Sequence, residues 1–342
     1  PGNPPNCHLI TSRGRMTSAI KPPPLEKGGV VGIAAPASPF DRDAFARGVR
    51  ALEESGYRVA FDEGIFSRDG YLAGSDRRRA EELARLFADP RVGAIFCARG
   101  GYGSQRVLPM LDAGLIRRSP KIFVGYSDIT ALHGFLGGEC GLVTFHGPLV
   151  TEMGGMGPGA LRALLSSLGK TAAWGGIASG LRAVRGGRAE GKIVGGSLSV
   201  FCATLGTRYA PHTKGRVLLF EDGGGKPYAV DRLFSTLRIT GTIGGARGML
   251  LGRFVPPAGW SGGDDAYQAE IRRIALDATD GCPFPVLAGF PAGHFPGNTC
   301  FPLGVRVAEL ADDVPGVALR QQAAEQRGPA GGILEHRRGS GE

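Results

Sequence analysis

The chain has 342 residues, of which 42% are hydrophobic and 21% are charged, a balance typical of a globular protein with room for two domains. The net charge is +9, but no aromatic residues are interleaved with the one basic cluster (Arg182, Arg185, Arg188 and Lys192), so we expect no nucleic-acid partner. No stretch approaches the length of an apolar membrane span, and residues 1–28 lack the apolar segment of a signal peptide, so we expect no membrane partner and a cytoplasmic location.

The N-terminal half alternates apolar strands with amphipathic helices. After a polar, proline-rich stretch (residues 1–28) that we expect to be a disordered leader, the pattern predicts strands at 29–35, 57–61, 92–98, 122–124 and 142–145 and helices at 41–55, 76–88 and 104–111. Asp41 and Ser75 are placed to cap two of these helices. This alternation predicts a parallel sheet with helices on both faces, and hence an α/β domain over residues 29–150.

The second half has a different composition. The glycine-rich residues 151–189 predict a passage between domains, and residues 190–319 predict a smaller C-terminal domain of mixed α/β structure. Its expected strands are at 191–194, 216–221, 248–254, 286–288 and 301–307, and its expected helices are at 197–204, 228–238 and 264–277. The Gln/Arg/Gly-rich residues 320–342 predict a flexible tail.

The most informative segment is 121–133, in which a short apolar run ends in Gly-Tyr before Ser127 and a potential helix. This is the pattern of a nucleophile elbow, a tight strand-to-helix turn that exposes one hydroxyl over the end of a sheet. Ile129 stands where the usual motif has its second glycine, so an ordinary capping serine is an alternative. Ser127 and the loop 99–103 both follow predicted strands, at the edge where parallel sheets bind ligands.

A serine nucleophile requires a base and a group that orients the base. The apolar strand 216–221 ends in a carboxylate at Glu221, and His294 lies in a rigid Gly/Pro-rich loop after a strand. Each is also compatible with an ordinary surface position, and His146 is the main competitor for the base. The order Ser127, Glu221, His294 has the acid before the base, as in α/β-hydrolases, and predicts a serine hydrolase.

No cofactor and no metal are expected. Gly101-Tyr-Gly103-Ser-Gln-Arg106 lacks the third glycine of a dinucleotide fingerprint, and Gly169-Lys170-Thr171 has Leu164 where a P-loop requires glycine. The six cysteines include no C-x-x-C pair and the histidines no H-x-x-x-H spacing. We therefore expect buried reduced thiols rather than disulfides or a zinc site.

Together these motifs resemble the LD-carboxypeptidase family, serine peptidases of cell-wall recycling, and their microcin-immunity relatives. The resemblance covers residues 28–310 and consists of several blocks in order: Ala35-Pro-Ala-Ser38, Arg99-Gly-Gly-Tyr-Gly103, Gly125-Tyr-Ser-Asp128, His146-Gly-Pro148, Gly195-Gly-Ser-Leu-Ser199, Phe220-Glu-Asp222, Asp231-Arg232, Gly293-His294 and Pro302-Leu-Gly304. It implies that Ser127, Glu221 and His294 form a catalytic triad. It also implies an active site between the α/β domain and the smaller C-terminal domain, and commonly a homodimer.

By the same resemblance, the substrate is a small peptide, the murein tetrapeptide, from which a terminal D-Ala is released through an acyl-enzyme. We expect the backbone N–H groups of Asp128 and Gly101 to hold the oxyanion. Arg99, Gly100 and Tyr102 are expected to contact the substrate. An arginine fork suits the substrate carboxylate, although a structural salt bridge of Arg99 is an alternative.

Two other functions stay open at this point. A microcin-immunity-type serine peptidase that cleaves an aminoacyl-nucleotide conjugate would need an aromatic platform, and Trp174 and Trp260 are the only tryptophans. Trp260, in a glycine-rich loop, is the candidate. A non-catalytic muropeptide-binding protein is the alternative from another class, and the presence of all three triad residues argues against it.

Overall fold

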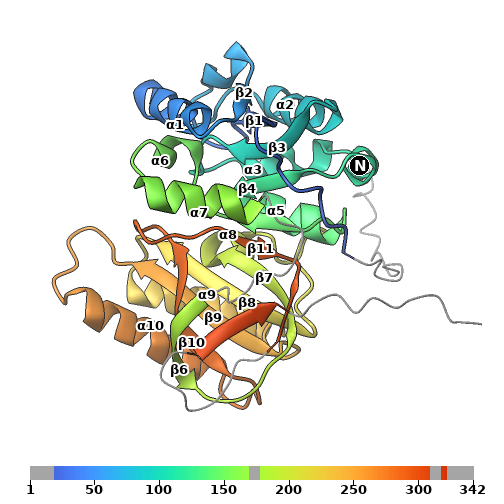
Figure 1. Ribbon diagram of the computed structural model, residues 1–342. Coiled ribbons are helices and arrows are strands. Elements are labelled where there is room, and N and C mark those ends of the chain that lie inside the picture. The colour runs from blue at the N-terminus through green and yellow to red at the C-terminus, as the bar shows by residue number, and fades with distance from the viewer. Residues whose placement is uncertain (1–18, 169–177, 309–316, 322–342) are drawn as a thin grey trace, which may run out of the picture.

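The chain folds into two lobes that stack one above the other (Figure 1). The computed structural model describes residues 19–168, 178–308 and 317–321. An open sheet with helices forms the N-terminal lobe and a closed barrel forms the C-terminal lobe, which confirms the predicted two-domain α/β architecture. Several predicted features lie outside the described residues: the start of the leader (1–18), the P-loop-like segment 169–171, Trp174 and residues 322–342 of the tail.

The N-terminal sheet has the strand order β11-β5-β4-β3-β1-β2. Its strands are β1 (Val30–Ala34), β2 (Arg58–Ala60), β3 (Val92–Cys97), β4 (Ile122–Gly125), β5 (Thr144–His146) and β11 (Phe301–Leu303). The first five are parallel, as predicted. β11 comes from the far end of the chain and pairs antiparallel with β5, which was not predicted from the sequence.

Helices cover both faces of this sheet (Figure 1). They are α1 (Arg42–Glu54), α2 (Asp76–Ala88), α3 (Ser104–Val107), α4 (Ala113–Arg118), α5 (Thr130–Gly138), α6 (Val150–Met153) and α7 (Pro158–Leu168), with the 3₁₀ helices η1 (Glu63–Phe66), η2 (Leu108–Met110) and η3 (Ser127–Ile129). Neighbouring strand residues point to opposite faces, so Ile95 joins the core under α2 and α5 and Phe96 joins the core under α1 and α7. Asp41 and Ser75 cap α1 and α2, as predicted.

Two segments expected outside the N-terminal domain pack against it. In the expected leader, Leu25 is buried and its N–H donates to the carbonyl of Leu168, and Ile20 bridges to Leu142. In the expected passage between domains, α7 contributes Leu161 and other leucines to the same core. Residues 19–28 and α7 therefore lie with the N-terminal lobe, because their apolar side chains are buried there.

Two predicted elements are interrupted. The helix expected at 104–111 ends after α3 and continues only as η2, because Pro109 has no N–H and its ring disfavours a helix interior. The strand expected at 301–307 divides into β11 and β12 (Arg306–Ala308) at Gly304, which has φ +83°. As a result, β11 joins the N-terminal sheet while β12 joins the barrel.

The C-terminal lobe is a closed barrel with the strand order β10-β6-β13-β12-β7-β8-β9. Besides β12, its strands are β6 (Ala178–Arg185), β7 (Gly191–Ser197), β8 (Arg216–Gly223), β9 (Gly248–Val255), β10 (Val286–Gly293) and β13 (Val317–Gln321), and its helices are α8 (Leu198–Ala203), α9 (Pro227–Ile239) and α10 (Asp264–Ala278). Leu219 and Leu250 belong to the core inside the barrel, whereas Phe220 and Met249 belong to the core between barrel and helices. β6 falls in the expected passage between domains, and β13 extends into the expected tail.

The two lobes are joined by strand pairing and by side-chain contacts. β11 inserts into the N-terminal sheet at the junction (Figure 1). The Gln105 side chain donates to the carbonyl of Ala203, and the Ser197 N–H donates to the hydroxyl of Thr130. These contacts determine how the ends of β4, β8 and β10 face one another.

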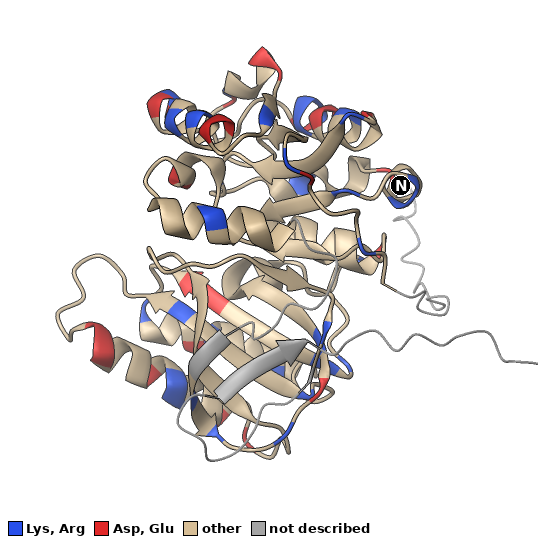
Figure 2. Ribbon diagram, viewed as in Figure 1, with Lys and Arg blue, Asp and Glu red and all other residues tan. Residues whose placement is uncertain are grey.

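Positively and negatively charged residues are interspersed along the ribbon of both lobes (Figure 2). Within the predicted basic cluster, Arg185 serves the barrel itself, since it donates to the carbonyls of Thr279 and Cys282. Among the described residues, no helix is both long enough and apolar enough to cross a bilayer.

Candidate active site

Ser127 stands at the tip of a strained turn. β4 ends at Gly125, Tyr126 is extended, and Ser127 has φ 64°, in the left-handed region. It is the only non-glycine residue with positive φ in the described part of the chain. Such a conformation costs about 1–3 kcal/mol and clusters at functional sites. The turn has the strand–turn–helix form predicted for a nucleophile elbow.

Two glycines allow the elbow to pack closely. A Cβ at Gly125 would lie 2.9 Å from Cγ2 of Ile129, the residue in place of the motif's second glycine. A Cβ at Gly100 would lie 3.0 Å from Cβ and 3.2 Å from Oγ of Ser127. The bare backbone of Gly100 therefore brings the loop after β3 directly against the serine.

Ser127, His294 and Glu221 form one hydrogen-bonded relay across the two lobes. Ser127 Oγ lies 2.9 Å from His294 Nε2, and His294 Nδ1 lies 3.0 Å from Glu221 Oε2. His294 follows β10 directly, and Glu221 lies near the end of β8. With its hydrogen on Nδ1, His294 donates to Glu221 and accepts from Ser127. This arrangement can transfer the serine proton to the imidazole while the carboxylate holds the ring.

Burial and charge act in opposite directions in this relay. Burial raises a carboxyl pKa, but the imidazoles of His294 and His146 outweigh that effect and lower the pKa of the fully buried Glu221. Burial would lower the pKa of His294, yet the carboxylates of Glu221, Asp222 and Glu152 together raise it above its ordinary value, with Glu221 contributing most. Glu221 is therefore a carboxylate at neutral pH, and His294 is a stronger base than a free imidazole.

The two neighbouring carboxylates of β8 have separate surroundings. Asp222 accepts hydrogen bonds from the N–H of Ser199 at 2.8 Å and from the hydroxyls of Ser197 and Ser199. Burial raises the pKa of Asp222, and the nearby charge of Glu221 raises it further. Asp222 thus anchors the first turn of α8, whereas Glu221 faces His294.

The expected oxyanion donors lie on the elbow and on the loop beside it. Asp128 is in the first turn after Ser127, where backbone N–H groups have no partner within the helix. Its carboxylate accepts the N–H of Ser104 at 2.8 Å, which ties the elbow to α3. Gly101 has φ 98°, and a Cβ there would lie 2.5 Å from Oγ of Ser38, so this position requires glycine.

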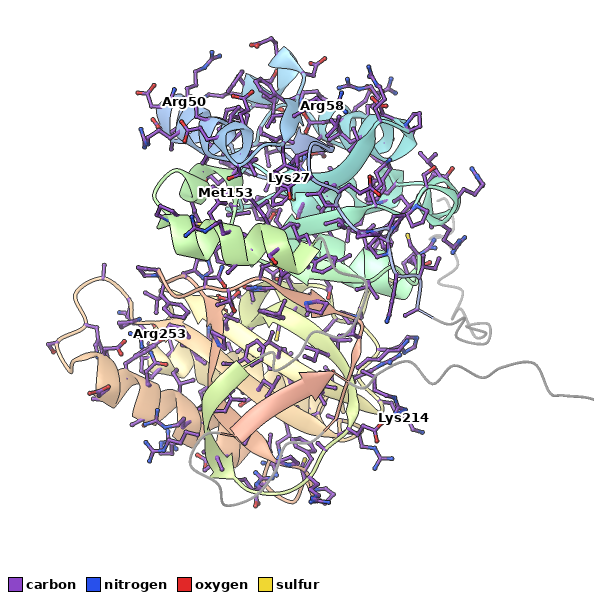
Figure 3. The ribbon with its side chains drawn as sticks, in the orientation of Figure 1. Lys27, Arg50, Arg58, Met153, Lys214 and Arg253 are labelled. Carbon is purple, nitrogen blue, oxygen red and sulfur yellow. The ribbon has the colours of Figure 1, made fainter. Side chains whose placement is uncertain are left out.

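The expected substrate-binding side chains are on the surface of the same loop. Arg99 is exposed, and its Nη1 donates to the carbonyl of Pro39 at 2.6 Å rather than to a carboxylate. The ring of Tyr102 is half exposed and packs edge-on against exposed Tyr71, with centroids 5.6 Å apart. On the barrel lobe, Arg253 (Figure 3) lies beside the end of β10 and is ion-paired with the first residue of α10.

His146 and His133 are not in contact with Ser127. His146, the competitor for the base, is fully buried with its Nε2 3.9 Å from Oε1 of Glu221, so it lies behind the acid. His133 has Nε2 2.8 Å from the carbonyl of Gly125 and supports the strand end before the elbow. The structure thus brings His294, the base expected from the sequence, to Ser127, and it places His146 at Glu221, which the sequence did not indicate.

Sequence reasoning also missed two groups beside the relay. The ring of Tyr126 lies 5.0 Å from that of His294, and its hydroxyl donates to Oε1 of Glu152 at 2.5 Å. Burial raises the pKa of Tyr126, and Glu152 raises it further, so the phenol stays protonated. The aromatic residue inside the Gly-Tyr-Ser elbow was the available signal for this wall of the site.

The expected nucleoside platform is occupied by local contacts. Trp260 Nε1 donates to the carbonyl of Gly263 at 2.9 Å, and the indole packs edge-on against the buried ring of Tyr267. Within the described residues, no group of three or more His, Cys, Asp or Glu side chains is placed to hold a metal ion.

A serine on a strained elbow, with an imidazole and a buried carboxylate at the seam of two lobes, is the arrangement of the serine hydrolases, a class that includes serine peptidases. Residues 31–147 match the LD-carboxypeptidase N-terminal domain, and residues 190–308 match the LD-carboxypeptidase C-terminal domain. The chain belongs to the LD-carboxypeptidase family.

Relatives of the chain include carboxypeptidases and an immunity protein. A probable murein peptide carboxypeptidase of Bacillus subtilis is 35% identical over 305 residues, which covers 86% of this chain and 93% of the relative. The structure of a muramoyltetrapeptide carboxypeptidase from Oxalobacter formigenes superposes with a TM-score of 0.73 at 25% identity, covering 85% of this chain and 98% of that one. The microcin C7 self-immunity protein, known from Escherichia coli, superposes with a TM-score of 0.77 at 25% identity, covering 88% and 98%.

Proposed function

We propose that the protein is an LD-carboxypeptidase that hydrolyses the amide bond between an L-configured centre and the C-terminal D-Ala of a murein tetrapeptide. The observation that carries this proposal is the continuous relay from Ser127 through His294 to Glu221. The names of the carboxypeptidase relatives support a murein peptide as the substrate class.

In the proposed reaction, His294 Nε2 takes the proton of Ser127 as Oγ attacks the carbonyl carbon of the scissile amide. The C–N bond then breaks, His294 returns the proton to the leaving amine, and D-Ala departs from an acyl-enzyme. Water that gives its proton to His294 next attacks the ester, and the tripeptide is released as Ser127 regains its proton. Glu221 stays ionised throughout, keeps the ring in the correct tautomer and stabilises the imidazolium.

The negative charge that develops on the carbonyl oxygen requires donors fixed in advance. We assign this role to the backbone N–H groups of Asp128 and Gly101, since the first belongs to the turn that follows Ser127 and the second to the loop that packs on it. The carboxylate of Asp128 and the hydroxyl of Ser38 hold these two segments in place. In this proposal, backbone donors on two fixed segments hold the oxyanion.

The loop 99–103 is also the proposed contact for the two ends of the peptide. Arg99 is assigned to the C-terminal carboxylate, because its guanidinium is exposed and, among the described residues, is held only by the carbonyl of Pro39. Gly100 is assigned to the peptide backbone next to the scissile bond, because it touches Ser127. Tyr102, together with Tyr71, offers an exposed aromatic surface to the acyl side of the substrate.

The alternative functions account less well for the site. A microcin-immunity-type reaction would use the same relay, but it would need an aromatic platform for the nucleoside. The indole N–H of Trp260 donates to its own loop, and the ring packs on Tyr267. A protein that only binds muropeptides has no need of a strained serine whose hydroxyl is hydrogen-bonded to a carboxylate-held imidazole. We therefore propose the carboxypeptidase function in preference to both alternatives.

Release of D-Ala from purified murein tetrapeptide, followed by liquid chromatography, tests the proposal. We expect stoichiometric tripeptide and D-Ala from the wild-type protein and no turnover from Ser127→Ala with an unchanged melting temperature. An aminoacyl sulfamoyl-adenosine conjugate serves as the second substrate. Cleavage of the conjugate with an intact tetrapeptide would replace the proposal by the immunity-type function, and near-normal hydrolysis by Ser127→Ala would refute the serine mechanism.

We further propose a cytoplasmic location and a homodimer. The described cysteines are free thiols, the state that a reducing cytoplasm maintains. The homodimer is proposed from the family resemblance, and sedimentation of the purified chain tests it directly. A single monomeric species at micromolar concentration would refute it.

A further inference from the structure

The acid of the relay has one oxygen without a hydrogen-bond partner. Glu221 Oε2 accepts from His294, whereas Oε1 is buried and has no partner among the described residues. An ionised carboxylate that is removed from water loses much of its stabilisation unless both oxygens are compensated. The chain therefore needs a donor at Oε1 if the carboxylate is to stay charged and correctly oriented.

A second imidazole faces this oxygen. His146 Nε2 lies 3.9 Å from Oε1, and both ring nitrogens of His146 are buried and unpartnered in the described part of the chain. The ring is held from both sides, because it stacks on Phe301 with centroids 4.8 Å apart and lies 5.5 Å from the ring of Tyr126. A buried imidazole and a buried carboxylate oxygen, each without another partner, thus point to each other.

We propose that His146 is a positioning residue that donates its Nε2–H to Oε1 of Glu221 and thereby keeps Oε2 on His294. This inference rests on the proposed serine mechanism, and it extends the relay from three side chains to four. The separation needs to close by only about 1 Å to reach an ordinary hydrogen bond. His146 has no exposed surface, so it acts on the reaction only through Glu221.

The position of His146 in the sheet explains why it suits this role. It ends β5, where its backbone is paired with Gly125 of β4 on one side and with Phe301 of β11 on the other. Gly125 lies two residues before Ser127, and Phe301 lies seven residues after His294. The strand that holds His146 is thus fixed to the segments that carry the nucleophile and the base, while its side chain reaches the acid of the other lobe.

Two substitutions separate the proposed donor from simple packing. His146→Gln keeps an N–H near the position of Nε2, whereas His146→Phe keeps the ring shape and removes the donor. We expect His146→Phe to lower kcat about 10- to 100-fold with KM unchanged, the range for loss of a hydrogen bond to a charged group. His146→Gln should recover most of that loss.

A double-mutant cycle with Glu221→Gln makes the test specific. If His146 acts through the charge of Glu221, His146→Phe should cause less than about a threefold further loss in the Glu221→Gln background. The readout is the rate at which an activated-serine phosphonate probe labels Ser127, because this reaction requires the relay but not the peptide. Equal losses in both backgrounds, or a glutamine variant no better than the phenylalanine variant, would overturn the proposal.

A measurement on the wild-type protein covers the case in which His146→Phe does not fold. Nitrogen-15 NMR of the histidine rings should show His146 with its hydrogen on Nε2, and the opposite tautomer would overturn the proposal. If instead the carboxypeptidase assignment is wrong, the result differs from the one that overturns the role of His146. In that case the wild-type protein is labelled by the probe but releases no D-Ala, and the cycle still decides the role of His146.

Discussion

Replacement of Glu221 by glutamine tests whether the acid of the relay acts through its charge. The amide keeps the size of the side chain, but it removes a negative charge whose oxygen lies 3.0 Å from His294 Nδ1. The side chain has no exposed surface, so solvent neither screens the charge nor replaces it. Because the new amide can donate to Nδ1 and favour the wrong tautomer, we expect kcat to fall about 10⁴-fold.

The same substitution should shift the pH dependence. Glu221 raises the pKa of His294 above the ordinary value of 6.5, and protonated His294 cannot accept the proton of Ser127. Activity of the wild-type protein should therefore decline as the pH falls through a value above 6.5, and in Glu221→Gln the decline should move to lower pH. The assay is kcat/KM for D-Ala release from about pH 5 to about pH 9, with thermal unfolding as the control for folding. An unmoved profile, or a loss of less than about tenfold, would refute the reasoning.

Three further substitutions test the loop beside the serine. Gly100→Ala should lower kcat about tenfold, because the new Cβ would lie only 3.0 Å from Cβ of Ser127. Gly159→Ala is the matched control, since a Cβ there meets nothing within 4 Å. Equal rates in the two variants would contradict the argument. Arg99→Lys should raise KM for the tetrapeptide about tenfold with kcat unchanged, since an ammonium cannot form the bidentate contact, and an unaltered KM excludes Arg99 as the carboxylate ligand. Tyr102→Ala should raise KM about three- to tenfold without a change in melting temperature, because the ring is half exposed, and a KM equal to that of the wild-type protein removes the aromatic contact from the proposal.

Local sequence patterns predicted the N-terminal lobe more completely than the barrel. Continuous apolar strands and the helix caps at Asp41 and Ser75 can be recognised from short stretches of sequence, and α2 has the predicted bounds. Closure of the barrel depends on β6, which lies in the glycine-rich expected passage between domains, and on β13, which was not expected and runs from the end of the expected C-terminal domain into the expected tail. Pairing of such strands depends on partners far away in the sequence, so local periodicity does not predict it.

The site shows the same limit. The elbow pattern indicated Ser127, and the rigid Gly/Pro-rich loop favoured His294 as its base. His146 follows a strand in a similar segment, so it stayed a competitor until the family resemblance was considered. In the structure His294 reaches the serine from the barrel lobe, while His146 ends a strand beside the elbow and faces the acid. Strand alternation, by contrast, does distinguish Glu221 from Asp222, because successive side chains of a strand point to opposite faces.

The segment that carries the base is also the segment that joins the lobes. From His294 the chain runs into β11, which pairs with β5 of the sheet that presents Ser127. A displacement of the barrel relative to the sheet would therefore have to break these strand pairs or stretch residues 294–300 before it separated Nε2 from Oγ. The same strand pairs therefore fix the 2.9 Å contact between the two atoms. In the proposed reaction, binding then has only to place the scissile carbonyl against the relay.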